Sequence, residues 1–283
     1  MARLTKAEAK KHAEAVALLA KDTLTEDERE FVREHWQESA TNVNSAAGAF
    51  FTPMSQAYDF ALEFDVDGPR IIDLCAGIGN LSAAAWARAT THRWHGTPAA
   101  EIVCVELNPQ YIEVGRKLFP EATWVEASIF DLPDLGHFDV AISNPPFGKV
   151  NRGGGGAPTY TGAEFEFHVI DIASQLADSG CFILPGNSVP FRYSGAPYYE
   201  DIENRKYETF KKQTGIELNA GIGVDTTVYI DDWHGVKVQT EHVWADFTEV
   251  RAARLPKPEL VEVVEQAQAV RGPDLLDLLG DVA

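Results

Sequence analysis

The sequence predicts an α/β fold, a doubly wound and mostly parallel sheet with helical extensions at both ends of the chain. From about residue 46, apolar strand-like runs alternate with helical stretches, which is typical of a parallel sheet with helices on both faces. With 45% hydrophobic residues in 283, the chain can bury the core of one large α/β domain. The expected strands lie at 70–75, 101–105, 122–127, 138–143 and 180–184, and the expected helices near 81–90, 109–118 and 163–177.

A helical hairpin is expected in residues 1–45. Its second helix begins at a capping-box pattern, Thr25 followed by Glu28. Two amphipathic helices alone bury too little to be stable, so we expect the hairpin to cover the main domain or a partner. The first helix carries a stripe of Ala9, His12, Ala13, Val16, Leu19 and Ala20, and the second carries Phe31, Val32 and Trp36. We expect His12 to be a packed or half-exposed residue rather than a ligand.

The main domain is expected to span residues 46–250 and to end in an antiparallel pair. Runs around 216–230 and 236–247 bracket a turn-rich segment at 231–235, which favours a hairpin at the edge of the sheet. A helical tail should follow at 251–283, with a helix near 258–270 that stops at Gly272-Pro273.

The composition indicates the cellular compartment of the protein and whether its cysteines could bind a metal. No apolar run is long enough to cross a membrane, and the N-terminal residues are polar rather than signal-like, which favours a cytoplasmic protein without a membrane partner. The three cysteines, Cys75, Cys104 and Cys181, lie in apolar strand-like stretches without metal-ligand spacing. We therefore interpret them as small core residues and expect no metal site.

The formal charge of −19 argues against a generally basic nucleic-acid binder. A local positive cleft could still coexist with acidic outer faces. Two clusters are candidates for such a cleft or are ordinary solvated faces: Lys149 with Arg152, and Arg205, Lys206, Lys211 and Lys212.

Asn144-Pro145-Pro146-Phe147 follows directly after an expected buried strand, at the sheet edge where α/β folds bind ligands. The two prolines stiffen the backbone and remove two N–H donors, leaving carbonyls that can face a ligand. Asn144 adds an amide oxygen and Phe147 an apolar ring. Together these groups suit a planar heterocyclic amine, although a Pro-rich turn would have the same sequence.

Three acidic residues lie at or just after successive expected strands. Asp73 opens a Gly-rich turn, residues 73–80, which leads into a helix whose N-terminus can receive an anion. Asp73 could hold a cationic amino group. Glu106 ends the next strand, where a carboxylate can accept both hydroxyls of a ribose, and Asp131 follows the third, where it could take an adenine amino group.

In order along the chain, these motifs resemble those of S-adenosylmethionine-dependent adenine-N6 DNA methyltransferases. The resemblance covers roughly residues 46–250, and its specific parts are Gly48-Ala49-Phe50-Phe51-Thr52-Pro53 and the Asn-Pro-Pro-Phe sequence. It implies the Rossmann-like fold of class I methyltransferases, with seven strands of which the last is antiparallel.

The resemblance also implies a role for each residue of the site. The amine-binding turn is Asn144 to Phe147, in which Asn144 and the Pro145 carbonyl hold the target amine, Pro146 stiffens the turn and Phe147 stacks on the base. S-adenosylmethionine would be bound by Phe51 and Thr52 over its methionine end, by Asp73, Ala76, Gly77 and Gly79 at its amino-acid portion, by Glu106 at the ribose and by Asp131 at the adenine.

Several alternatives remain open from the sequence. Only about 33 residues follow residue 250, so recognition of the target could come from residues 187–212, from the terminal helices or from a protein partner. The motifs favour DNA as the nucleic acid, but Asn-Pro-Pro-Phe-Gly is also similar to ribosomal RNA adenine-N6 methyltransferases. Glutamine methylation of a release factor and a non-catalytic cofactor-binding protein are the other hypotheses.

Overall fold

The computed structural model describes residues 4–37, 50–65, 69–91, 100–234 and 236–254. Residues 1–253 make up one unit, and residues 254–283 make up a second, of which only Arg254 is described. Gly48 and Ala49 of the first motif and the expected helix at 258–270 with its Gly272-Pro273 stop lie outside the described residues.

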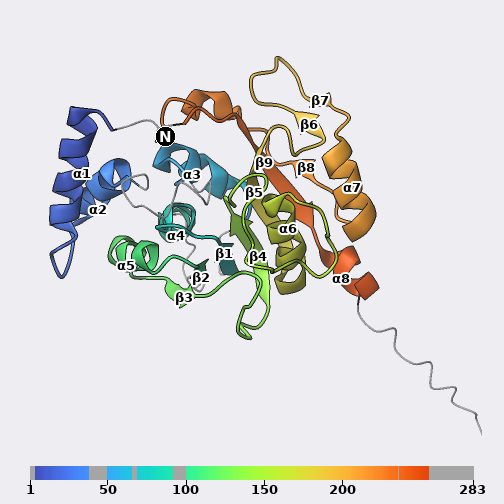
Figure 1. The fold of residues 1–283 in the computed structure, drawn as a ribbon, viewed down its shortest axis with the longest axis horizontal. Helices are drawn as coiled ribbons and strands as arrows, with labels where there is room; N and C mark the ends of the chain where they lie inside the picture. The colour runs from blue at the N-terminus through green and yellow to red at the C-terminus, as the bar shows by residue number, and fades with distance from the viewer. Residues whose placement is uncertain (1–3, 38–49, 66–68, 92–99, 235, 255–283) are drawn as a thin grey trace, which may run out of the picture. The chain divides into compact units, whose positions relative to one another are not determined.

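A seven-stranded sheet organises the first unit (Figure 1). The order is β3-β2-β1-β4-β5-β9-β8, in which the first five strands are parallel and β9 and β8 are antiparallel to their neighbours. The predicted doubly wound, mostly parallel sheet is thus confirmed. The strands are β1 Arg70–Leu74, β2 Glu101–Glu106, β3 Thr123–Glu126, β4 Phe138–Ser143, β5 Ala177–Pro185, β8 Asn219–Ala220 and β9 Thr240–Asp246.

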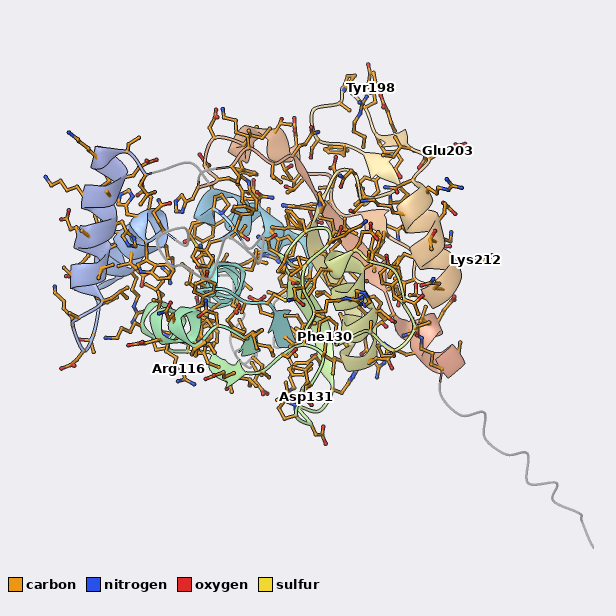
Figure 2. All side chains as sticks on the ribbon, in the orientation of Figure 1. Arg116, Phe130, Asp131, Tyr198, Glu203 and Lys212 are labelled. Carbon is orange, nitrogen blue, oxygen red and sulfur yellow. The ribbon has the colours of Figure 1, made fainter. Side chains whose placement is uncertain are left out.

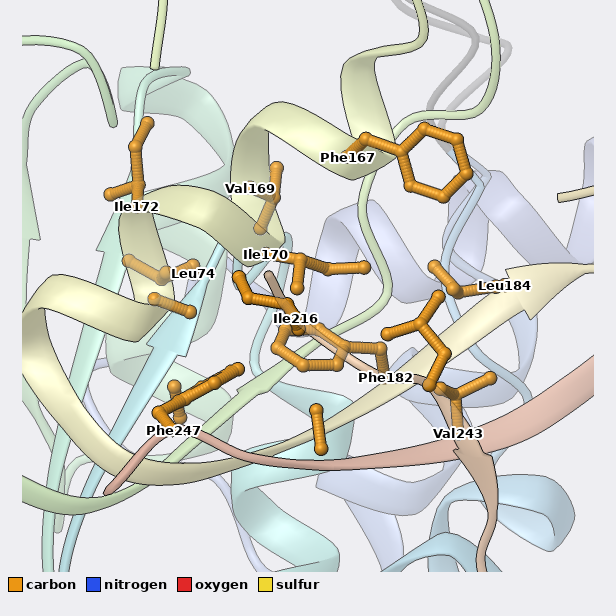
Figure 3. Packing of buried hydrophobic residues seen from close by; sticks show 14 of the residues in the cluster. Leu74, Phe167, Val169, Ile170, Ile172, Phe182, Leu184, Ile216, Val243 and Phe247 are labelled. Atoms are coloured by element: carbon orange, nitrogen blue, oxygen red, sulfur yellow. The ribbon is translucent and has the colours of Figure 1, made fainter. Parts of the chain in front are cut away.

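Successive side chains of a strand point to opposite faces of the sheet, and on this sheet both faces are covered by an apolar core. Ile72 and Leu74 of β1 belong to the core shared with α6 (Phe165–Leu176) and α7 (Arg205–Thr214), part of which Figure 3 shows. Ile71, the residue before Ile72, belongs to the opposite core, shared with α3 (Met54–Phe60), α4 (Asn80–Thr91) and α5 (Pro109–Leu118). The apolar runs of the parallel strands follow from this double burial.

The N-terminal hairpin consists of α1 (Lys6–Leu18) and α2 (Glu26–His35), and both helices begin with a capping box. It packs on α5: the Arg33 guanidinium donates to the Leu118 carbonyl at 2.7 Å. Val32 and Trp36 are buried as predicted.

The predicted stripe on α1 is wrong. Ala9, Ala13, Val16 and Ala20 are exposed, and the buried residue of the helix is Ala15, with His12 and Leu19 half-buried beside it. His12 is packed as expected, since its Nδ1 accepts from the Gln37 N–H at 3.0 Å. α1 is Ala-rich, so several faces have similar hydrophobicity and the sequence does not specify which one packs.

The antiparallel pair at the sheet edge is shorter than predicted. Of the run at 216–230, only Asn219 and Ala220 form a strand, and Thr226–Tyr229 is the 3-10 helix η4. The sequence also gave no signal for α3, for the 3-10 helix η3 (Ala61–Glu63) or for the small hairpin of β6 (Phe191–Arg192) and β7 (Glu200–Asp201). α8 (Thr248–Arg254) follows β9.

Two further sequence expectations concern the cysteines and the absence of a membrane-spanning helix. Cys104 and Cys181 are buried core residues, but Cys75 lies in the turn after β1 with a positive φ of 62° rather than in a strand. In the part of the chain that the structure describes, no helix has both the length and the apolar character needed to cross a membrane.

Candidate active site

A small cavity lies at the carboxyl ends of β1 and β4. These two strands are neighbours and parallel, so the segments that follow them leave the sheet at the same edge. The cavity is lined by Phe50, Phe51, Thr52, Asp73, Cys75, Ala76, Gly77, Ile78, Asn80, Leu81 and Asn144. Six predicted site residues, Phe51, Thr52, Asp73, Ala76, Gly77 and Asn144, are therefore brought together.

The turn after β1 needs its glycines for two different reasons. Gly77 and Gly79 have positive φ values of 59° and 85°, a conformation that side chains with a Cβ rarely adopt. A Cβ on Gly77 would also lie 3.0 Å from the Phe51 ring, and one on Gly79 would lie 3.0 Å from Trp124. Gly77 thus brings the backbone close to the cavity, whereas Gly79 allows the turn to pack on β3.

Asp73 is a buried carboxylate at the base of the cavity. Its Oδ2 accepts from the Ser82 hydroxyl at 2.7 Å, while its Oδ1 is buried without a hydrogen-bond partner among the described residues. Burial raises the pKa of Asp73 to about 7; the Ser82 hydrogen bond opposes the shift and nearby Glu106 adds to it. A buried acceptor that lacks a partner is suited to a positively charged donor.

Asn144 has one orientation imposed by its partners. Its Nδ2 donates to the Phe50 carbonyl at 3.0 Å and to the Thr52 hydroxyl at 2.9 Å. Because the carbonyl can only accept, the amide nitrogen must face residues 50–52, and the oxygen Oδ1 faces away from them. The amide oxygen is thereby left available for a donor in the cavity.

Residues 50–52 connect the part of the site that follows β1 to the part that follows β4. The Thr52 carbonyl accepts from Asn80 Nδ2 at 2.8 Å, so this short segment is tied both to α4 and to Asn144. The Phe51 ring stacks on Trp36 with ring centroids 5.6 Å apart and meets Tyr111 edge to face at 5.0 Å. The N-terminal hairpin therefore supports Phe51, a residue of the cavity lining.

The remaining residues of the Asn-Pro-Pro-Phe turn lie beside the cavity rather than in its lining. Pro145 is buried, and Pro146 and Phe147 are half-buried. Phe147 packs against the apolar core under α3 and α4. Phe147 is thus not fully enclosed by that core.

Glu106 lies next to the cavity at the end of β2, and its carboxylate is already engaged. Oε2 accepts from the Gly77 N–H at 2.8 Å, and Oε1 accepts from the Leu107 and Asn108 N–H groups, both at 2.8 Å. Burial raises the pKa of Glu106, against the effect of these three bonds. A carboxylate has about four lone-pair positions, so holding both hydroxyls of a ribose requires Glu106 to share or release a backbone bond.

Asp131 is exposed, near the lower edge of the view in Figure 2. It does not line the cavity. Its N–H donates to the Ser128 carbonyl in the turn after β3. Gly79 and Glu106 do not line the cavity either, but each is bonded to a lining residue: the Gly79 N–H donates to the Ala76 carbonyl, and Glu106 accepts from the Gly77 N–H.

Sequence reasoning missed Asn80, which lines the cavity and has a buried Oδ1 without a hydrogen-bond partner among the described residues. Its position directly after Gly79, at the start of α4, was the available signal. Cys75, Ile78 and Leu81 were also missed as lining residues.

Several cations of the two basic clusters are engaged by other residues of the protein. Arg152 turns inward to the buried His168, whereas Lys149 is exposed. In the second cluster, Lys206 pairs with Glu164 at 3.4 Å and Lys211 with Glu217 at 2.7 Å. Among the described residues, no group of three or more His, Cys, Asp and Glu side chains could hold a metal ion.

Solved structures with a similar fold include methyltransferases. A putative class I S-adenosylmethionine-dependent methyltransferase from Listeria monocytogenes has 12% identity and a TM-score of 0.53, with 81% of this chain and 69% of that chain covered. The fold is that of a class I methyltransferase. No protein-family model matches the sequence, and no curated protein was found to match it.

Two further solved structures match this chain and are described in different terms. One is a modification subunit of a putative type I restriction enzyme from Vibrio vulnificus, with 12% identity, a TM-score of 0.50 and 80% of this chain covered. The chain spans only 50% of the length of that subunit. The other is a putative RNA methyltransferase from Pyrococcus horikoshii, with 16% identity, a TM-score of 0.45 and coverage of 82% and 94%.

Proposed function

We propose that this protein transfers a methyl group from S-adenosylmethionine to the N6 amine of adenine in DNA. The observation that carries the proposal is that Asp73 and Asn144 line one cavity. One offers a buried acceptor for a cationic group of the cofactor, and the other an amide oxygen for the amine.

The residues fit the chemical groups of the cofactor. The unpaired Oδ1 atoms of Asp73 and Asn80 suit its ammonium group, and the N-terminus of α4, at the cavity wall, suits its carboxylate. The Phe51 ring suits the sulfonium, since a cation is attracted to an aromatic face. When bound, S-adenosylmethionine supplies an electrophilic methyl group.

Asn144 would act on the amine. The lone pair of an exocyclic adenine nitrogen is delocalised into the ring, and acceptors at Asn144 Oδ1 and the Pro145 carbonyl favour the pyramidal geometry in which it is free. The nitrogen then forms a bond to the methyl carbon as the carbon–sulfur bond breaks and its electron pair goes to sulfur. The nitrogen finally releases one proton to water, so no strong general base is needed. Positioning of the reactants is then a major contribution to catalysis.

The target base must leave the duplex to reach this turn, and stacking on Phe147 would offset part of an unstacking cost of a few kcal/mol. RNA is the second candidate, supported by the same amine-binding turn, and the description of the Pyrococcus neighbour names that substrate. A protein partner for target recognition is also proposed, because the Vibrio neighbour is described as a subunit.

The test is methyl transfer from tritiated S-adenosylmethionine to unmethylated DNA, RNA and protein, followed by nucleoside analysis for N6-methyladenine. Asn144→Ala should abolish transfer while cofactor affinity stays within several-fold. Asn219→Ala, at an exposed position of β8, is the matched control and should behave as the wild type. Label in RNA or protein alone would overturn the DNA proposal, and turnover by Asn144→Ala would overturn the role of Asn144.

A further inference from the structure

Gly148, the residue after the Asn-Pro-Pro-Phe turn, is held by both of its backbone groups. Its N–H donates to Glu166 Oε2 at 2.7 Å, and its carbonyl accepts from the Phe165 N–H at 2.7 Å. Its φ is +74°, and a Cβ at this position would meet no atom within 4 Å. The glycine is therefore needed for the backbone conformation rather than for space.

Glu166 is a buried carboxylate, 1% exposed, in the first turn of α6. Its Oε2 binds Gly148, and its Oε1 accepts from the Ser188 hydroxyl at 2.6 Å. Ser188 is fully buried and follows β5, the strand that neighbours β4. One side chain thus connects the segments that follow two adjacent strands, on the edge of the sheet where the site lies.

The turn depends on its ends for rigidity. Pro145 and Pro146 have no N–H, so they cannot anchor the turn by donating to its surroundings. The first end is fixed by Asn144 Nδ2 on residues 50–52, and the second end is fixed by Gly148 on α6. Between these two anchors lie the Pro145 carbonyl and the Phe147 ring, which the proposed reaction uses.

We propose that Glu166 is a positioning residue, which holds the Pro145 carbonyl and Phe147 in place for methyl transfer by fixing Gly148. The inference rests on the proposed function. Glu166 touches neither the cofactor nor the amine in this role, and it acts only through the shape of the turn.

The variants separate this role from a general structural one. Glu166→Ala removes both acceptors, whereas Glu166→Gln can still accept from Gly148 and can donate to the Ser188 oxygen. Ser188→Ala, the matched control, removes the hydrogen bond to Glu166 Oε1 and leaves the bond from Gly148 to Oε2 intact. Gly148→Ala disturbs the same turn by its backbone conformation, without a clash, and leaves Glu166 in place.

We expect Glu166→Ala to lower methyl transfer by about 100-fold, the scale of a 1 Å misplacement at a reacting centre. Cofactor affinity, measured by calorimetry on the same folded sample, should stay within several-fold. Glu166→Gln and Ser188→Ala should keep most of the activity, and Gly148→Ala should behave like Glu166→Ala. Amide exchange in peptides covering residues 144–150 should accelerate in Glu166→Ala but not in Ser188→Ala.

The possible outcomes test the proposed function and the role of Glu166 separately. Absence of wild-type methyl transfer to DNA, RNA and protein would overturn the proposed function and this inference with it. Wild-type activity that Glu166→Ala retains would overturn the inference alone. A parallel loss of cofactor affinity and turnover, or unchanged amide exchange at the turn, would also overturn it, because Glu166 would then be structural or uncoupled from the turn. If Glu166→Ala does not fold, the same measurements are made on Gly148→Ala. Wild-type methyl transfer by that variant would overturn the inference.

Discussion

At the scale of single residues, the candidate site places polar groups where they destabilise the free protein. Asp73 is buried with one oxygen lacking a partner among the described residues, and its pKa is raised to about 7 from 3.8. Between these two pH values the folded state keeps the proton that the unfolded chain has lost. Stability therefore falls as pH rises from about 4 to about 7 and stays lower above that range.

Asp73→Asn should remove this penalty, because an amide carries no charge to desolvate. At pH 8 we expect the variant to gain up to roughly 4 kcal/mol in the free energy of unfolding, and at pH 4 to gain little. Urea denaturation at both pH values measures this. Asp131→Asn, at an exposed site, is the control, and an equal pH dependence of wild type and Asp73→Asn would contradict the prediction.

Cofactor affinity should depend on the same proton. A carboxylate holds an ammonium better than a carboxylic acid does, so wild-type affinity for S-adenosylmethionine should rise as pH increases from 6 to 8. Asp73→Asn should bind more weakly, by roughly 1.5 to 3 kcal/mol at pH 8, and lose this pH dependence. Calorimetry across the pH range tests both points, and a variant that retained the wild-type pH profile would show that Asp73 does not hold the ammonium.

At the scale of elements, α5 packs on β3 through Gly115 and Trp124. A Cβ on Gly115 would lie 2.2 Å from the Trp124 ring, and this ring is fixed because its Nε1–H donates to the Phe119 carbonyl at 3.1 Å. The close approach also brings Trp124 to Gly79 in the turn after β1. The helix position and the turn are thus set by one indole ring.

Gly115→Ala should be destabilising although alanine is the better helix former. The added methyl group has to displace an anchored ring, which costs about 1–3 kcal/mol and exceeds the gain in helix propensity of about 1 kcal/mol. Thermal or urea unfolding would detect the change. Gly186→Ala, whose Cβ would find its nearest neighbour 4.0 Å away, should differ from wild type by no more than about 0.5 kcal/mol. Equal effects of the two substitutions would argue against the packing explanation.

At the scale of the whole molecule, the charge of −19 opposes binding to a polyanion. Only some cations of the two candidate clusters can face phosphates, because Arg152 turns to His168 and Lys206 and Lys211 are paired with carboxylates. Lys149 is exposed and makes no ion pair with a residue that the structure describes. A protein partner that supplies further cations is consistent with this excess of negative charge over the cations that can face phosphates.

The salt dependence of DNA binding should therefore be shallow and should depend on Lys149. If Lys149 contacts one duplex phosphate, Lys149→Ala should flatten the slope of log affinity against log salt by about 0.9. Arg152→Ala should lower folded stability and leave the slope nearly unchanged. Fluorescence anisotropy with a labelled duplex at several salt concentrations measures the slope, and a larger change in Arg152→Ala would reverse the assignment.

The sequence by itself determined the sheet, most of its strands and the turn after β1. These features depend on periodicity and on glycine and proline within a few residues, which local sequence encodes. It did not determine the face on which α1 packs, because an Ala-rich helix has no distinct apolar stripe, nor the two-residue length of β8, which depends on its partner strand.

Only the tertiary structure decided how the site is held together. Asn144 meets Phe50 across 94 residues, and Glu166 reaches Gly148 and Ser188 from a helix between them. Such bonds exist because parallel strands deliver distant segments to one edge of the sheet. Nothing near Glu166 in the sequence distinguishes it from a solvated acid, since its partners are a backbone N–H and a hydroxyl that become neighbours only after the strands have paired.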